Sequence, residues 1–424
     1  MTVPFVERKL CYGPAQFAYT KKRGARDALL LMLMSWLEAF DKRSRVALYC
    51  SDVAGAFDRV SAARLEEKLR AHGIHSQLVS VFVSWLGRRE ASVAIGGGTS
   101  EGISLENMVY QGTVLGPISW NRFFGDARQA TQMVEFLEVI YADDLNAFKV
   151  TNECDDNKVF ASIRECQDSL HSWGEANQVT FEASKESEHI LCPRFPRGPN
   201  FRILGINFDC RLRMQDAAAE MTDEIGWKIR TITRVRRYYN ESEIIGLYKS
   251  HILSYIEYRT PAIYHACSST LAKVDKIQRH FVQSLGMSEL DALIHFKLAP
   301  LSARRDIALL GLIHRTVLGG GPQQFQRFIR PPWRHQSVVT SARRHRFHLE
   351  DVLIPSSLQL CSRSIFGLLR VYNLLPAEVV ESSFSVSSFQ GRLQELLLSR
   401  AIVGCADWAD TFSPRIPSYE HPLR

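Results

Sequence analysis

The stretch "EVIYADDLNAFKV" (138–150) alternates apolar and polar residues, which is typical of half-buried β-strands joined in a hairpin. In its middle it places two carboxylates side by side, Asp143 and Asp144. Two ionised carboxylates about 4 Å apart repel by about 4 kcal/mol at an effective dielectric of about 20. The repulsion is relieved if a cation lies between the two carboxylates or if one of them is protonated. The alternative without a functional role is an ordinary Asp-Asp turn exposed to solvent.

A third acidic residue favours the cation. The segment "SRVALYCSDV" (44–53) reads as a short apolar strand that ends in Asp52. Carboxylate oxygens at strand ends suit Mg²⁺ or Mn²⁺ better than Zn²⁺. We therefore expect Asp52, Asp143 and Asp144 to converge on a divalent metal site.

The composition is that of an ordinary globular protein with a mild basic excess. Its 52 Lys and Arg residues against 45 acids give a net charge of +7, which permits a polyanionic partner without requiring one. The nine cysteines form neither a CxxC pair nor a zinc-like cluster, so we expect reduced thiols in an intracellular protein, nuclear or cytoplasmic. The most apolar run (28–37) is too short to span a bilayer, and no membrane partner is expected.

The hydrophobic pattern changes along the chain. Strand-like segments and helices alternate up to about residue 212, and a helical period dominates after it, which indicates an α+β half followed by a helical half. The same pattern predicts a helix at 61–73, a single helix at 118–134, a strand-like stretch at 179–192 and a hairpin at 201–209.

With these acidic strand ends and the segments around them, the chain resembles the reverse transcriptases of non-LTR (LINE-type) retrotransposons. Nearly the whole chain takes part in the resemblance. The matching segments, in the family's order, are "QFAYTKKRGARDAL" (16–29), "DVAGAFDRV" (52–60), "QGTVLGPISWNRFF" (111–124), "YADDLNAF" (141–148), "WGEANQVTFEASKES" (173–187) and "LGINFD" (204–209). The segments similar to the region after the polymerase are "SYIEYRTPAIY" (254–264), "APLSARRDIALLGLIHR" (299–315) and "FGLLRVYNLLPAEVV" (366–380).

The resemblance implies a right-hand polymerase. Its parts would be a residual fingers segment (1–40), a palm with a ferredoxin-like antiparallel sheet and helices (41–212), a helical thumb and connection (213–318) and a basic, mostly helical C-terminal region (319–424). Only about fifteen residues precede Gln16, so we expect an N-terminally truncated polymerase that lacks most of the fingers.

The implied activity is RNA-directed DNA synthesis, with an RNA template, a DNA primer and dNTPs as partners. In the family, the acids that match Asp52, Asp143 and Asp144 hold two Mg²⁺ (or Mn²⁺) ions. The lysine that matches Lys185 lies near the triphosphate and is a candidate proton donor to pyrophosphate; a surface lysine is the simpler interpretation. The alternative function is that of a catalytically inactive retrotransposon relic that only binds nucleic acid.

Other residues match the nucleotide and primer sites of the family. Phe57 matches the side chain that lies under the sugar and excludes a 2′-hydroxyl, although it could be a core residue. Gln111 and Gly112 match the loop that lines the dNTP pocket. Tyr141 would either pack under the primer terminus or serve as a strand aromatic.

The later candidates concern the primer and the template. Leu204 and Gly205 match the hairpin that supports the primer strand. The arginine-rich segment 327–346, which includes Trp333, is either a nucleic-acid-binding segment or a basic linker. Three arginines at helical spacing could follow a phosphate backbone or form a solvated face: Arg230, Arg234 and Arg237.

Overall fold

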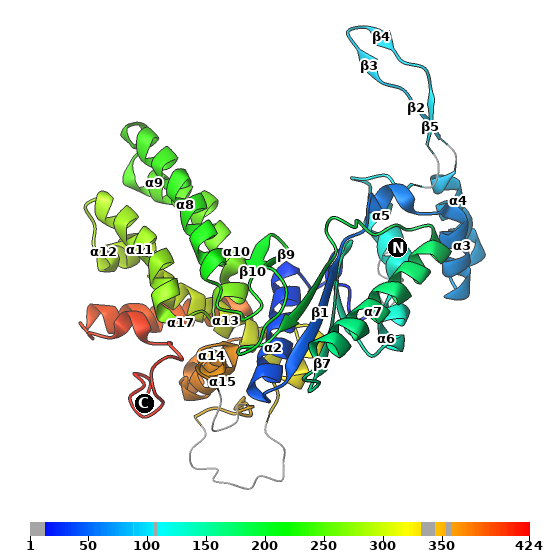
Figure 1. Cartoon of the computed structure of the whole chain (residues 1–424). Coiled ribbons are helices and arrows are strands. Elements are labelled where there is room, and N and C mark those ends of the chain that lie inside the picture. The colour runs from blue at the N-terminus through cyan, green and yellow to red at the C-terminus, as the bar shows by residue number, and fades with distance from the viewer. Residues whose placement is uncertain (1–12, 88, 106–107, 332–343, 353–357) are drawn as a thin grey trace. The chain divides into compact units, whose positions relative to one another are not determined.

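The computed structural model of the chain forms two compact units (Figure 1). The described residues are 13–87, 89–105, 108–331, 344–352 and 358–424. The first unit comprises Met1–Ala28, Arg45–Leu191 and Pro196–Gly198. The second unit comprises Leu29–Ser44, Cys192–Phe195 and Pro199–Arg424.

A four-stranded antiparallel sheet forms the centre of the first unit, with the strand order β6-β7-β1-β8. Helices lie between β1 and β6 and again between β7 and β8, so the chain follows a βαββαβ order. The α+β class predicted from the sequence is confirmed, whereas the palm and thumb assignments remain predictions. The strands are β1 (Arg45–Ser51), β6 (Leu137–Tyr141), β7 (Asp144–Thr151) and β8 (Ser187–Leu191).

The helices of the first unit agree with the sequence in part. Ser61 caps α3 (Ala62–Ala71) by accepting the Arg64 N–H, as predicted for 61–73. The single helix predicted at 118–134 is wrong, because the chain turns at Asp126 between α5 and α6. The helices are η1 (Ala56–Arg59), α3 (Ala62–Ala71), α4 (Ser76–Leu86), α5 (Leu115–Phe124), α6 (Arg128–Met133) and α7 (Asp156–Asn177).

The turn between α5 and α6 has a physical cause that lies far away in the sequence. Lys68 Nζ donates to the Phe123 carbonyl (2.7 Å) at the end of α5 and pairs with the Asp126 carboxylate (2.8 Å). Trp173 Nε1 donates to the same carboxylate oxygen (3.1 Å). These contacts satisfy the polar groups of the turn, so the helix ends there.

The core of the first unit lies between the sheet and its helices. Ala47 and Tyr49 of β1 pack in one cluster with Ile163 and Leu170 of α7. Every residue of β1 is buried, and because successive side chains point to opposite faces, both faces of this strand are covered. Burying each large apolar side chain contributes about 1.5–3 kcal/mol, so β1 is a rigid support for the residue that follows it.

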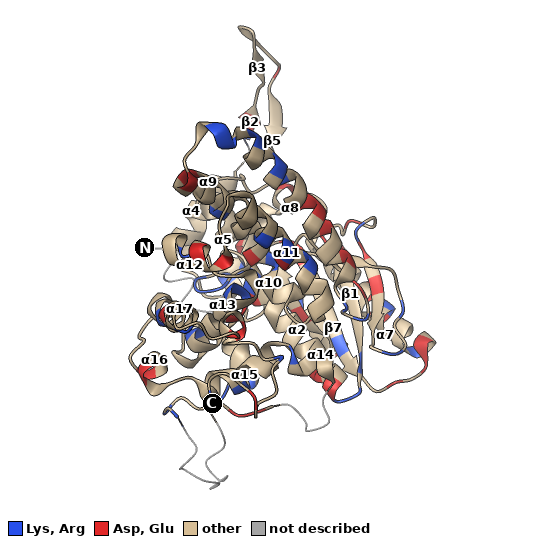
Figure 2. Ribbon diagram, turned by 90° about the vertical axis from the view of Figure 1, so that its left-hand side faces the viewer, with Lys and Arg blue, Asp and Glu red and all other residues tan. Residues whose placement is uncertain are grey.

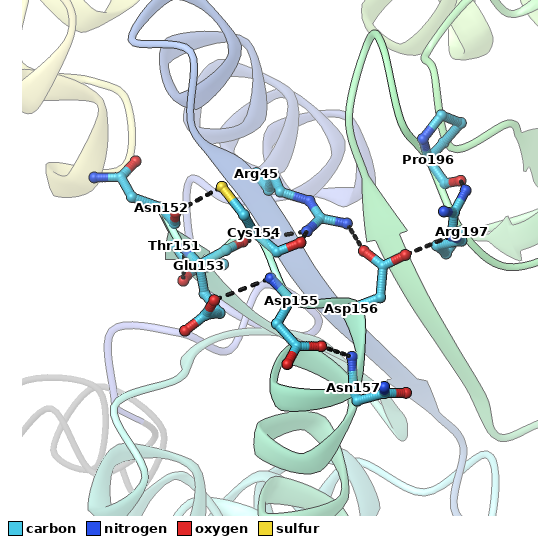
Figure 3. Close-up of polar contacts among 10 residues, drawn as sticks. All are labelled: Arg45, Thr151, Asn152, Glu153, Cys154, Asp155, Asp156, Asn157, Pro196 and Arg197. Carbon is cyan, nitrogen blue, oxygen red and sulfur yellow. Dashed lines mark hydrogen bonds and ion pairs between the residues drawn. The ribbon is translucent and has the colours of Figure 1, made fainter.

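Polar contacts join the start of β1 to the start of α7 (Figure 3). The Asp156 carboxylate accepts from the Arg45 guanidinium and from Arg197 Nε (2.6 Å). Arg45 also donates to the carbonyls of Glu153 (3.2 Å) and Cys154 (3.1 Å). The loop before α7 is thereby fixed to the first residue of β1.

A thin arm of short strands extends from the first unit (Figure 1). Most residues of its strands are exposed, and Gly96 and Gly97 form its tip with φ values of 59° and 86°, which suit glycine. The strands are β2 (Arg89–Ala91), β3 (Ala94–Ile95), β4 (Gly98–Thr99) and β5 (Ile103–Leu105), with β2 paired to β5 and β3 to β4.

The second unit is mostly helical, which confirms the change of period predicted from the sequence. The hairpin predicted at 201–209 packs Phe201 and Phe208 edge-on against Trp36 of α2, with ring centroids 6.4 and 6.0 Å apart. No described helix is both long enough and apolar enough to span a bilayer. The elements are α2 (Ala25–Asp41, which begins in the first unit), β9 (Phe201–Ile203), β10 (Ile206–Phe208), α8 (Gln215–Val235), η2 (Arg236–Tyr238), α9 (Glu241–Tyr248), η3 (Lys249–Leu253), α10 (Ser254–Ile263), α11 (Ser268–Ser284), α12 (Glu289–Phe296), α13 (Leu301–Val317), η4 (Gln323–Arg327), α14 (Gln359–Ser362), α15 (Ile365–Leu374), α16 (Ala377–Glu381), α17 (Val386–Ile402) and η6 (Trp408–Asp410).

A buried carboxyl group in α13 makes the stability of the second unit depend on pH. Asp306 is 3% exposed and accepts a hydrogen bond from the Tyr264 hydroxyl. Burial raises the pKa of Asp306 to about 7, against the opposing effects of Tyr264, Arg415 and Arg305. The neighbouring Arg305 is already paired with another carboxylate, so Asp306 keeps its proton in the native state up to nearly neutral pH.

We predict that Asp306→Asn changes the pH dependence of stability. The unfolded chain releases this proton near pH 4, so the stabilising contribution of Asp306 is complete below about pH 4 and is lost as the pH rises through about 7. The wild-type free energy of unfolding should therefore fall relative to that of the variant between pH 4 and 8, as measured by urea unfolding. The exposed Asp168→Asn is the control, and a difference that does not vary with pH would contradict the prediction.

Candidate active site

Two of the acidic residues singled out from the sequence lie opposite each other on neighbouring strands. In the antiparallel pairing of β1 with β7, Ser51 faces Leu145. The next position along this register sets Asp52, which follows β1, across from Asp144, which begins β7. Because neighbouring strands are about 4.8 Å apart, their side chains leave the same end of the sheet close together.

The third acidic residue lies in the turn beside them. Tyr141 pairs with Asp144 across the β6–β7 hairpin, which leaves Ala142 and Asp143 as a two-residue turn. Ala142 has a φ of +60°, a left-handed conformation that costs a non-glycine residue about 1–2 kcal/mol. The surroundings of the turn must supply that energy.

The electrostatics of the site show that the three carboxylates influence one another. Burial, followed by the charges of Asp52 and Asp143, raises the pKa of Asp144 to about 6 against the opposing effect of Lys185. Burial and Asp52 also raise the pKa of Asp143, while its own backbone N–H and Lys185 oppose the shift. This end of the sheet is therefore a concentrated negative site that favours a cation.

Lys185 supplies one positive charge. The segment before β8 runs beside the end of β1, where the Glu182 N–H donates to the Asp52 carbonyl (2.9 Å). A turn closed by Lys185 N–H to the Glu182 carbonyl (2.8 Å) brings the ammonium onto the Asp52 carboxylate. The strand-like reading of 179–192 is wrong in its first part, because this turn precedes the strand Ser187–Leu191.

The ion pair bears on metal binding. Among the described residues, no group of three or more Asp, Glu, His or Cys side chains is arranged to hold a metal ion. The three carboxylates offer the hard oxygen donors that Mg²⁺ prefers, but in the described structure they are not grouped as a metal site, and the Asp52 carboxylate is paired with the Lys185 ammonium. The convergence on a divalent metal that the sequence predicts therefore stays a prediction, and Lys185 would have to leave Asp52 before that carboxylate could bind an ion.

A buried glutamine holds the turn that carries Asp143. Gln16 is 3% exposed; its Nε2 donates to the Ala142 carbonyl (3.2 Å) and its Oε1 accepts the Ala142 N–H (3.0 Å). Trp120 Nε1 donates to the same carbonyl (2.8 Å). These three hydrogen bonds satisfy both backbone groups of a strained residue, so they fix the position of the adjacent carboxylate.

The sequence analysis missed the roles of Gln16 and Trp120, although both lie in segments that it quoted. Gln16 reaches the turn because Ala15 and Phe17 exchange backbone hydrogen bonds with Ile140 (3.0 and 2.9 Å), alongside β6. The only signal in the sequence was a polar amide before the apolar residues of "FAY". Tyr19 was missed as well, and its raised pKa reflects burial first and then the nearby Asp143.

The predicted nucleotide-binding residues lie near one another but make no described contact with the carboxylates. Phe57, half-buried in η1, stacks on Trp120 with ring centroids 5.9 Å apart and an interplanar angle of 23°. The Val109 N–H donates to the Phe57 carbonyl (2.7 Å), which brings the following loop alongside η1. In that loop Gln111 and Gly112 are exposed, and the φ of +77° at Gly112 suits glycine.

The predicted primer-binding residues are divided between the two units. Tyr141 is half-buried at the end of β6 in the first unit. Leu204 and Gly205, with φ values of 49° and 76°, form the turn between β9 and β10 in the second unit. The Tyr258 hydroxyl donates to the Leu204 carbonyl (3.0 Å), so the turn is fixed to α10.

The arginines at helical spacing are exposed in the second unit. Acidic residues occupy the first half of α8 and basic residues its second half (Figure 2). This arrangement complements the helix dipole, so the arginines have a stabilising role even without a phosphate partner. Phosphate contact therefore stays a prediction for the three arginines. They are Arg230 and Arg234 in α8 and Arg237 in η2. Trp333, predicted to stack on nucleic acid, lies outside the described residues.

The segment that carries the three carboxylates and Lys185 matches a known protein family. Residues 8–208 match the family model of "Reverse transcriptase (RNA-dependent DNA polymerase)", and the match includes Asp52, Asp143, Asp144 and Lys185. The matched segment, slightly less than half of the chain, is thus similar to reverse transcriptase domains, which belong to the nucleotidyltransferase class. This match supports the resemblance to reverse transcriptases seen in the sequence. The search of curated proteins gave no match.

Proposed function

We propose that the chain is an RNA-directed DNA polymerase of the non-LTR retrotransposon type. It would transfer a nucleotidyl group from a dNTP to a primer 3′-hydroxyl on an RNA template by a two-metal reaction. The observation that carries the proposal is the β1–β7 register, which sets Asp52 opposite Asp144 with Asp143 in the adjoining turn. The non-LTR assignment is supported by the sequence resemblance, which extends beyond residue 208.

The acidic residues and the lysine take separate roles in this proposal. Asp52, Asp143 and Asp144 would hold Mg²⁺ or Mn²⁺. When bound, such ions lower the pKa of the primer hydroxyl and neutralise the charge of the triphosphate. The Lys185 side chain is 62% exposed, so its ammonium can leave Asp52 and pair with the departing pyrophosphate.

The remaining residues would position the substrates. Tyr141 would lie under the primer end, with the Leu204–Gly205 turn supporting the primer strand. Gln111 and Gly112 would line the dNTP pocket. The exposed arginines of α8 and η2, Arg230, Arg234 and Arg237, would contact the phosphates of the template-primer duplex. Such a reaction places the protein inside the cell, in the nucleus or the cytoplasm.

Phe57 would exclude ribonucleotides, because a bulky ring under the sugar leaves no room for a 2′-hydroxyl. We predict that Phe57→Ala lowers the preference for dTTP over UTP by about tenfold or more. Measuring kcat/KM for both nucleotides tests this prediction. Phe160→Ala, in a half-buried phenylalanine packed on the same core, is the control. An unchanged preference in Phe57→Ala would assign the ring to the core alone.

Primer extension tests the proposed function directly. The full chain is incubated with poly(rA)/oligo(dT), dTTP and Mg²⁺, and we expect the primer to lengthen. RNA binding that weakens with salt, without extension, would contradict the proposal and support the catalytically inactive relic that only binds nucleic acid.

A further inference from the structure

A polar pocket of about 430 Å³ lies in the second unit, beyond the residues that match the reverse transcriptase family. It is lined by α14, α15, the first residue of α11 and the segment 414–421. No Asp or Glu is among its described lining residues, whereas three arginines and one histidine are. These four residues are Arg363, Arg370, Arg415 and His421.

Two of these arginines are held in place without being neutralised. Arg363 Nε donates to the His265 carbonyl (2.6 Å). Arg415 donates to the carbonyls of Tyr264 (2.6 Å) and Ala266 (3.3 Å). Within the described part of the chain, neither guanidinium has a carboxylate within 4.0 Å. Carbonyl oxygens satisfy N–H groups but leave the positive charge in place, so both guanidiniums can still bind an anion.

The surroundings of the two guanidiniums also favour a bound anion. Burial lowers the pKa of Arg363, and Arg415 lowers it further against the opposing Cys267 thiol. Asp306 and Asp410 act on Arg415 only from beyond ion-pairing distance. The Arg415 Nε–H is buried and has no hydrogen-bond partner among the described residues. An anionic oxygen in the pocket would accept a hydrogen bond from the Arg415 Nε–H. It would also reduce the electrostatic repulsion between the guanidiniums of Arg363 and Arg415.

The end of a helix also favours an anion at this pocket. Arg370 of α15 lines the pocket as well, but its charge is offset by the ion pair with Asp351 (2.6 Å), which is outside the lining residues. Ser268 begins α11, a helix of 17 residues whose first N–H groups and dipole favour negative charge. Planar guanidiniums can form paired hydrogen bonds with the oxygens of a phosphate, whereas a monatomic halide ion offers no such pair of acceptors.

We propose that this pocket binds a phosphate group of a nucleic acid strand or of a nucleotide. This choice of ligand rests on the proposed function, since a reverse transcriptase would use both of these molecules. The pocket contains none of the proposed catalytic residues, so its function can be tested separately from DNA synthesis.

The test uses the full chain in EDTA, so that divalent ions do not support triphosphate binding at the catalytic site. Ser418 is exposed and lines the pocket, and Ser418→Glu would place a carboxylate beside the arginines without removing any of their contacts. Calorimetry should show that inorganic phosphate binds the wild-type chain and binds Ser418→Glu about tenfold or more weakly. Ser387→Glu, on the exposed face of α17, is the matched control and should bind like wild type.

Further probes identify the source of the phosphate. They are dTTP and a short RNA with and without a 5′-phosphate. A loss of affinity in Ser418→Glu for dTTP alone would indicate a nucleotide site. A loss only for the phosphorylated RNA would indicate a strand end, and an equal loss for both RNAs would indicate the backbone. Equal affinity of wild type and Ser418→Glu for every probe, or no phosphate binding at all, would overturn the proposal.

Discussion

Asp143→Ala is expected to abolish primer extension and to lower kcat by about a thousandfold or more, the scale expected when a group that acts on the transition state is removed. Asp143 lies in the β6–β7 turn directly before Asp144, and its charge contributes to the raised pKa of the Asp144 carboxyl. Its removal takes an oxygen donor from the proposed metal site. Rates of dTTP incorporation on poly(rA)/oligo(dT) provide the measurement.

A control separates this effect from a loss of structure. The Asp143 side chain is half-buried in a turn whose backbone is held by Gln16 and Trp120, so the variant should unfold at nearly the wild-type temperature. Asp168→Ala, an exposed aspartate on α7 of the same unit, should extend primers at the wild-type rate. Wild-type extension by Asp143→Ala would remove the basis for a role of these carboxylates in catalysis.

The placement of the carboxylates follows from local patterns, which is why it could be predicted from the sequence. An apolar run ending in Asp52 and an alternating hairpin with Asp143 at its turn each define a strand end. The antiparallel pairing of β1 with β7 then brings the two ends together. The local patterns do not show which strands pair with each other, and the family resemblance supplied this information.

The contacts that hold the site depend on pairs of residues far apart in the chain, so no local pattern reveals them. Gln16 and Ala142 are separated by 126 positions, and Lys185 and Asp52 by 133. The end of α5 depends in the same way on Lys68, and for that reason the single helix predicted at 118–134 was wrong. Propensity describes neighbours in sequence, whereas these side chains act as neighbours only after the fold has formed.

The second large effect is expected from Gln16, whose described side-chain hydrogen bonds go to backbone groups and not to a carboxylate. Gln16→Leu removes two hydrogen bonds from Ala142, which is held in a left-handed conformation. Leaving buried polar groups unsatisfied costs about 1–3 kcal/mol, so the turn should spend less time in the geometry that aims Asp143 at the site. We predict that kcat falls about tenfold to a hundredfold, with KM for dTTP little changed.

The dependence on Mg²⁺ distinguishes positioning from simple support of the fold. If Gln16 positions Asp143, Gln16→Leu should need more Mg²⁺ for half-maximal extension, and Trp120→Phe, which loses one hydrogen bond to the same carbonyl, should show a smaller shift in the same direction. Gln129→Leu, at an exposed position of α6, should leave the Mg²⁺ dependence unchanged. A defect in stability alone reduces the number of folded molecules but not their affinity for Mg²⁺. A Gln16→Leu protein that unfolds at lower temperature, yet keeps the wild-type Mg²⁺ dependence, would therefore contradict the prediction. It would show that the amide stabilises the domain without positioning the Asp143 carboxylate.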